Sequence, residues 1–183
     1  MALVPGPVRA GDPELVPLGK KSVSVTFMAG QTFSPSPGGF AEAVVSDLEA
    51  SRFVATRLEL GIELHPALWI RQPERPSGEG RQDVLAVAAD LILRWYPVRL
   101  GSRIEPYFEA ALGPCWSSEP VPAAGTQVNF LVQGGAGLLL RTGTRWSTVV
   151  GWRWFHLSNA NLGENNPGVN FSFLLVGGRL FLP

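Results

Sequence analysis

Cysteine is almost absent from this chain of 183 residues, which contains only Cys115. A single cysteine excludes an internal disulfide, and no histidine or cysteine partners stand at the spacing of a zinc site. Net charge is lacking too, because 15 Lys and Arg residues balance 15 Asp and Glu residues. The sequence has no basic run or surface that would indicate nucleic-acid binding. We expect no metal, no cofactor and no nucleic-acid partner.

Long apolar runs are also missing. No stretch approaches 20 consecutive apolar residues, which excludes a transmembrane helix. Residues 1–20 contain four prolines without a cationic start or a long apolar segment, so they do not read as a secretory signal. We predict an N-terminal extension at 1–20 and a single domain at 21–183. Only 16% of residues are charged, whereas six are Trp and 21 are Gly, a composition common in sheets that face apolar surroundings.

The rest of the chain alternates between apolar and polar residues in segments separated by Gly, Pro, Ser and Asn clusters, which predicts an all-β fold. The segment at 40–49 is the weakest, since its pattern also fits a helical turn. The predicted strands are 22–31, 40–49, 54–65, 83–96, 104–116, 127–141, 146–159 and 169–182.

The two faces of these strands differ sharply. One face is rich in Leu, Val, Ala and Phe, with Trp69, Trp95, Trp116 and Trp146 near strand ends, as in the lipid-facing belt of an outer-membrane barrel. The other carries nearly balanced charges, as a narrow barrel interior requires. These charges are Glu59, Glu63, Asp90, Glu105 and Glu109 with Arg57, Arg94, Arg141 and Arg153.

Long and short connections alternate along the chain, with short ones predicted at 50–53, 97–103 and 142–145. Short periplasmic turns that alternate with long outer loops are typical of outer-membrane barrels. We therefore predict an eight-stranded antiparallel up-and-down transmembrane β-barrel. A soluble barrel that binds an apolar ligand inside is the alternative, and it would reverse the two faces.

His156 and Ser158 end the seventh predicted strand. Residues two apart share one face of a strand, so the imidazole and the hydroxyl point the same way, a nucleophile beside its base. Trp152 and Trp154 share this apolar face. An isolated His-x-Ser is more often an ordinary strand end. On a lipid-facing surface, however, unpartnered polar groups are costly, which favours a functional explanation.

The run from His156 to Leu162, followed by Asn166-Pro167-Gly168 and a last apolar strand, resembles the PagL-type lipid A 3-O-deacylases. The resemblance extends from Trp152 to Arg179. It implies an eight-stranded barrel in the bacterial outer membrane that hydrolyses an acyl ester of lipid A in lipopolysaccharide. By this resemblance His156 is the general base, Ser158 is the nucleophile, and Asn159 stabilises the oxyanion or shapes the turn.

Asn170 stands at the position where the family has its orienting acid. An amide oxygen can still hold the imidazole but cannot balance an imidazolium charge. Glu164 in the adjacent loop is a second candidate for the acid, although an exposed glutamate is more often a solvated charge. The alternative function is a non-catalytic outer-membrane barrel that serves as an anchor or assembly component. His65 is expected at an interface or in the barrel interior and not as a metal ligand, and the sequence leaves a homodimer open.

Overall fold

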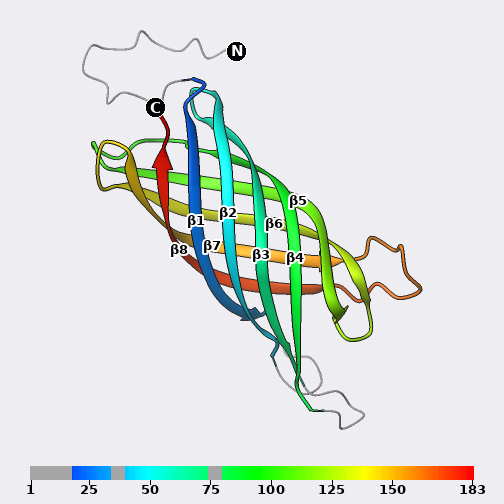
Figure 1. The fold of residues 1–183 in the computed structure, drawn as a ribbon. Helices are drawn as coiled ribbons and strands as arrows, with labels where there is room; N and C mark the ends of the chain where they lie inside the picture. The colour runs from blue at the N-terminus through cyan, green and yellow to red at the C-terminus, as the bar shows by residue number, and fades with distance from the viewer. Residues whose placement is uncertain (1–17, 34–39, 74–79) are drawn as a thin grey trace, which may run out of the picture.

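The computed structural model describes residues 18–33, 40–73 and 80–183, which form a closed barrel of eight antiparallel strands (Figure 1). Each strand pairs with the next in the chain, and β8 closes the barrel on β1. No helix within these residues has the length and apolar character needed to cross a bilayer. Residues 1–17, most of the predicted extension, lie outside the described part. The strands are β1 (Lys21–Thr32), β2 (Glu42–Ala55), β3 (Leu58–Gln72), β4 (Gln82–Trp95), β5 (Ile104–Val121), β6 (Thr126–Arg141), β7 (Trp146–Ser158) and β8 (Val169–Phe181).

The predicted faces are confirmed. Apolar side chains cover the outside, where Ile62 is 60% exposed and Leu174 73% exposed. Charged side chains of the same strands point inward, where Glu63 is 1% exposed and Arg153 2% exposed. An apolar exterior around a polar interior is the arrangement of a membrane barrel, and it is the reverse of a soluble barrel with an apolar interior.

The second strand is longer than predicted, and the turn expected at 50–53 is wrong. β2 continues to Ala55, and Thr56 and Arg57 form the two-residue turn before β3. Ser51 has the composition of a turn residue, but its hydroxyl points into the barrel and donates to Glu59 Oε1 at 2.7 Å. Arg57 was predicted inside the barrel and instead lies exposed in the turn, where its guanidinium donates to Pro97 O.

Three buried arginines hold the interior together. Arg94 contacts Glu49, Glu59 and Glu109 at 2.8–3.2 Å, and Arg179 contacts Glu49 and Glu59. Arg153 lies 2.8 Å from Glu63 and 2.7 Å from Glu109. Some of these pairs join neighbouring strands, whereas the pair between Arg153 of β7 and Glu63 of β3 crosses the barrel, so the network fills its middle.

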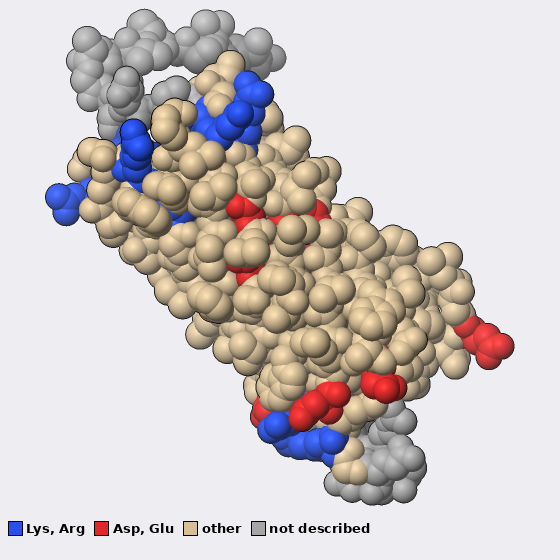
Figure 2. All heavy atoms as spheres, viewed as in Figure 1, with Lys and Arg blue, Asp and Glu red and all other residues tan. Residues whose placement is uncertain are grey.

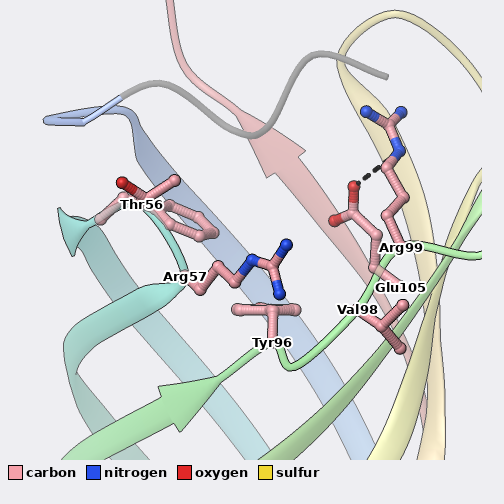
Figure 3. Close-up of a pocket in the computed structure, with 7 residues that line it drawn as sticks. Thr56, Arg57, Tyr96, Val98, Arg99 and Glu105 are labelled. Atoms are coloured by element: carbon pink, nitrogen blue, oxygen red, sulfur yellow. Dashed lines mark ion pairs between the residues drawn. The ribbon is translucent and has the colours of Figure 1, made fainter. Parts of the chain in front are cut away.

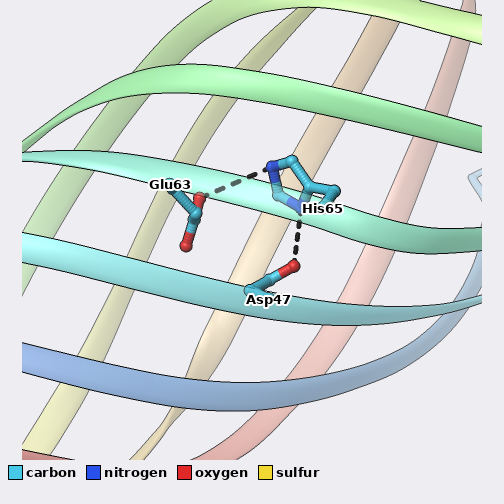
Figure 4. Close-up of side chains that lie close together, drawn as sticks. All are labelled: Asp47, Glu63 and His65. Carbon is cyan, nitrogen blue, oxygen red and sulfur yellow. Dashed lines mark hydrogen bonds and ion pairs between the residues drawn. The ribbon is translucent and has the colours of Figure 1, made fainter.

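His65 lies inside the barrel, as predicted, and is fully buried (Figure 4). Its Nδ1 is 2.6 Å from Asp47 Oδ1 and its Nε2 is 2.6 Å from Asp90 Oδ2. Ligand atoms of Asp47, Glu63 and His65 lie within 4.8 Å of one another, which is close enough for a shared metal ion. Each of these groups already has a protein partner, since Glu63 also contacts Arg153. We therefore interpret the cluster as part of the ion-pair network inside the barrel.

The two ends of the barrel differ. The turns β2–β3, β4–β5 and β6–β7 lie at the end where β8 finishes, and the β5–β6 and β7–β8 connections lie at the opposite end (Figure 1). Trp95 and Trp146 mark the outer surface at the first end, where each is at least half exposed. β7 runs from this end, so Ser158 lies at the opposite one.

Candidate functional site

The candidate site lies on the outer face of the hairpin formed by β7 and β8. His156 is directly opposite Asn170, and Trp154 is opposite Ser172, in an antiparallel register without shifts. Strand alternation places Trp152, Trp154, His156 and Ser158 in one row on the apolar outer surface, because residues two apart share a face. The register therefore brings together residues that are 14 apart in the chain.

Asn170 holds the imidazole of His156. The distance between His156 Nδ1 and Asn170 Oδ1 is 2.9 Å. Trp154 Nε1 donates to the same oxygen at 3.2 Å. An indole N–H can only donate, so it fixes the oxygen of the Asn170 amide, and not its NH₂ group, toward the histidine. Nδ1 of His156 must then carry a proton, so in the neutral form of the ring the lone pair is on Nε2.

The ring of His156 is confined from more than one side. The Trp154 ring stacks on it with centroids 5.9 Å apart and an interplanar angle of 23°. Gly168, whose φ of 56° is in the left-handed region, passes close to the ring. A β-carbon at position 168 would lie 3.1 Å from His156 Cε1, tighter than an ordinary contact. Glycine suits this position, because it adopts the left-handed conformation without strain and leaves space for the ring.

Ser158 is the last residue of β7 and is half-buried. Among the described residues, no hydrogen bond joins its hydroxyl to His156 or to any other group. The two side chains lie two residues apart on one face of β7. Hydrogen bonds of this kind are often loose or absent before a substrate binds.

Asn159 organises the loop that follows. Its side chain is buried, its Nδ2 donates to Asn165 O at 2.7 Å, and its Oδ1 accepts from Asn161 N at 3.0 Å. Its own backbone N–H donates to Asn166 Oδ1. Ala160 and Asn161 both have positive φ, which is uncommon outside glycine. The backbone N–H and one N–H of the side-chain amide of Asn159 are therefore engaged within the loop, as a turn-shaping role requires.

The other predicted residues are also located. Glu164 is exposed in the β7–β8 loop, and within residues 80–183 it is Asn170 and not Glu164 that binds His156 Nδ1. Trp152 faces outward and donates from Nε1 to Ser172 Oγ at 2.8 Å. Ser172 was missed by the sequence analysis, although its place two residues after Asn170 puts it on the same face. Gly168 was noted as part of a motif, but its contact with the ring was not foreseen.

An eight-stranded barrel with an apolar exterior and a charged interior is the architecture of an outer-membrane protein, and the His–Asn pair lies on its outer surface. The family model described as "Lipid A 3-O-deacylase (PagL)" matches residues 54–179. The chain therefore belongs to the PagL lipid A 3-O-deacylase family and to the bacterial outer membrane. A search among curated proteins gave no match.

Solved structures with the same fold include both an enzyme and other surface proteins. The outer-membrane enzyme PagL has a TM-score of 0.59 and 22% identity, covering 84% of this chain and 97% of that chain. Neisserial surface protein A has a TM-score of 0.64 and 16% identity, covering 88% and 97%. OprG from Pseudomonas aeruginosa has a TM-score of 0.58 and 11% identity, covering 90% and 96%. At these identities the similarity shows the fold alone.

Proposed function

We propose that this protein is an esterase that removes an acyl chain from lipid A, with Ser158 as nucleophile and His156 as general base. The observation that carries the proposal is the bond between His156 Nδ1 and Asn170 Oδ1 on the outer surface of the barrel. It gives the imidazole the tautomer that a general base needs. A site on this surface can receive an acyl ester from the outer leaflet without removing the lipid from the membrane.

The two ring nitrogens of His156 have different roles in the proposed reaction. Nε2 of His156 takes the proton of the Ser158 hydroxyl as its oxygen attacks the ester carbonyl. The same proton then goes to the leaving sugar oxygen, and an acyl-enzyme remains on Ser158. Water, activated by Nε2 in turn, releases the fatty acid. Asn170 keeps the ring in place throughout, but it supplies no negative charge to the imidazolium, so turnover below that of a carboxylate-containing site is expected.

Incubation of the purified protein with lipid A tests the proposal. We expect a released 3-hydroxy fatty acid, detected by mass spectrometry, and no release by Ser158→Ala. Ser118→Ala is the matched control, because this serine is also near the outer end of the barrel and its hydroxyl accepts a bond from Leu85 N. Equal release by the Ser158→Ala and Ser118→Ala proteins would remove Ser158 from the nucleophile role.

A non-catalytic barrel is the second candidate function, and Asn170 is the observation that favours it. If the carboxylate was lost because the activity was lost, the remaining scaffold would serve as an anchor or assembly component in the membrane. This candidate predicts that neither the natural chain nor Asn170→Glu releases fatty acid from lipid A, while both form a folded barrel. Release by either protein would rule it out.

A further inference from the structure

The end of the barrel opposite the candidate site carries an excess of positive charge. We define the basic rim as the lysines and arginines that surround this end: Lys20, Lys21, Arg52, Arg57, Arg99, Arg103, Arg141 and Arg145. Figure 2 shows blue side chains gathered there, whereas red ones prevail at the other end. At that other end the arginines are matched locally, since Arg71 pairs with Asp83 and Arg81 with Glu42.

Glu105 is the carboxylate that the basic rim shares within the described residues. Arg99 Nε lies 3.2 Å from its Oε1 (Figure 3), and Arg141 Nη2 lies 3.2 Å from the same oxygen. Arg103 forms no ion pair with any described residue. Two arginines therefore share one buried carboxylate, and Arg103 adds a further positive charge at the same part of the rim.

These three arginines line a hollow of about 500 Å³ that opens at the rim between the β4–β5 and β6–β7 turns. The hydroxyl-bearing residues Ser102, Thr142 and Thr144 complete its wall. Arg141 is held in position because its guanidinium lies over the Phe181 ring, 4.7 Å from the centroid. Guanidinium groups and hydroxyls around an open hollow are the donors that bind a phosphate.

The depth of the hollow in the membrane indicates which kind of molecule carries that phosphate. Trp146 follows the β6–β7 turn directly, and Trp95 precedes the β4–β5 connection and stacks on Phe108. Exposed tryptophans of a membrane barrel lie at the interface with water, at the depth of the lipid headgroups. Short turns face the periplasm, so these are the headgroups of the inner leaflet.

We propose that the hollow lined by Arg99, Arg103 and Arg141 binds the phosphate of an anionic phospholipid of the inner leaflet. An anionic headgroup without an amine complements the net positive charge of the wall, whereas a zwitterionic headgroup brings its own cation. Each arginine near an anionic lipid surface strengthens binding by about fivefold. This site lies across the membrane from His156 and does not depend on the proposed deacylation.

The test uses the full chain in nanodiscs that contain phosphatidylcholine and phosphatidylglycerol, and native mass spectrometry measures the lipid retained on the ejected protein. We expect preferential retention of phosphatidylglycerol, about fivefold weaker in Arg103→Gln and weaker still in Arg103→Gln/Arg141→Gln. Arg81→Gln is the matched control at the outer end and should retain the lipid as the natural chain does. Arg103→Gln keeps the test usable if loss of Arg141 prevents folding, because Arg103 forms no ion pair within residues 18–33, 40–73 and 80–183.

Three results would overturn the proposal. The first is equal retention of phosphatidylcholine and phosphatidylglycerol by the natural chain. The second is equal loss of phosphatidylglycerol in Arg103→Gln and Arg81→Gln, which would mean that charge anywhere on the barrel suffices. The third is complete displacement of the lipid by inorganic phosphate at a concentration similar to that of the lipid, which would identify a soluble anion as the ligand.

Discussion

At the scale of single residues, the orientation of one amide decides what His156 can do. The Asn170 side chain could offer either its oxygen or its NH₂ group to the ring. Trp154 Nε1 selects the oxygen, because two donors cannot face each other. An NH₂ group facing Nδ1 would impose the opposite tautomer, which is the defect produced by replacing the triad aspartate of a serine protease with asparagine.

Removal of the indole donor tests this explanation. Trp154→Phe keeps an aromatic ring against His156 but leaves the Asn170 amide free to turn. We expect a roughly fivefold to tenfold lower kcat with KM little changed, in keeping with about 1 kcal/mol for one hydrogen bond. Nitrogen NMR of His156 should show a mixture of tautomers where the natural chain shows the Nδ1–H form. An unchanged tautomer in Trp154→Phe would contradict the role of the indole.

A carboxylate at position 170 should raise turnover. In Asn170→Glu the imidazolium formed during the reaction gains an opposite charge, and Trp154 can still donate to the carboxylate. We expect at least about a tenfold rise in kcat for release of fatty acid from lipid A. The upper limit is a rise of roughly four decades. Replacing the triad aspartate of a serine protease with asparagine lowers turnover by about this much, and that loss includes a tautomer change which this chain avoids. Asn170→Leu, which removes the acceptor altogether, should lower kcat, and an increase there would exclude the proposed role.

At the scale of elements, the β7–β8 loop favours glycine at position 168. Gly168→Ala introduces a side chain at positive φ and a β-carbon 3.1 Å from His156 Cε1. We expect a loss of about 1 kcal/mol in the free energy of unfolding from the backbone alone. Displacement of the ring should additionally lower the rate of fatty-acid release from lipid A.

Gly101→Ala is the matched control for this substitution. Gly101 also has positive φ, at 62°, but it lies in the β4–β5 connection, and its β-carbon would meet nothing within 4 Å. The stability loss in denaturant should be similar in the two variants, while only Gly168→Ala should slow the reaction. Equal effects on the rate would mean that the ring contact is unimportant.

At the scale of the whole molecule, the interior arginines join strands that are far apart in the chain. Arg153→Gln would leave Glu63 and Glu109 without their closest cation inside the barrel. Loss of one partner from a buried ion pair costs about 3–5 kcal/mol. We expect a fall of this size in the free energy of unfolding, measured by urea titration in detergent micelles. Arg145→Gln, an exposed rim substitution, should change it by less than about 0.5 kcal/mol.

Much of this barrel could be predicted from the sequence because alternation is a local signal. Glu63 and Ile62 reveal their faces from neighbouring residues alone, and so do Asp90 and Leu91. β2 was harder, because Ser51 resembles a turn residue until its partner Glu59 is known. Arg179 was missed as an interior residue, since its contacts with Glu49 and Glu59 join opposite ends of the chain.

The candidate site, too, could be predicted from the sequence only in part. His156 and Ser158 could be identified because a two-residue spacing on a strand fixes their common face. The bond from Trp154 to Asn170 depends on the register between β7 and β8 and on side-chain rotamers, which no local pattern contains. The same is true of the contact between Gly168 and the imidazole.

The side chains that hold the imidazole all belong to two adjacent strands and the connection between them. The residues proposed to carry the chemistry therefore lie within one hairpin, and the other six strands supply the closed wall of the barrel in the bilayer. Grafting residues 146–181 onto an inert eight-stranded barrel with matching edge strands should transfer the hydrolysis of lipid A along with them. Small barrels of this architecture could thus gain or lose an enzymatic activity by exchanging a single hairpin.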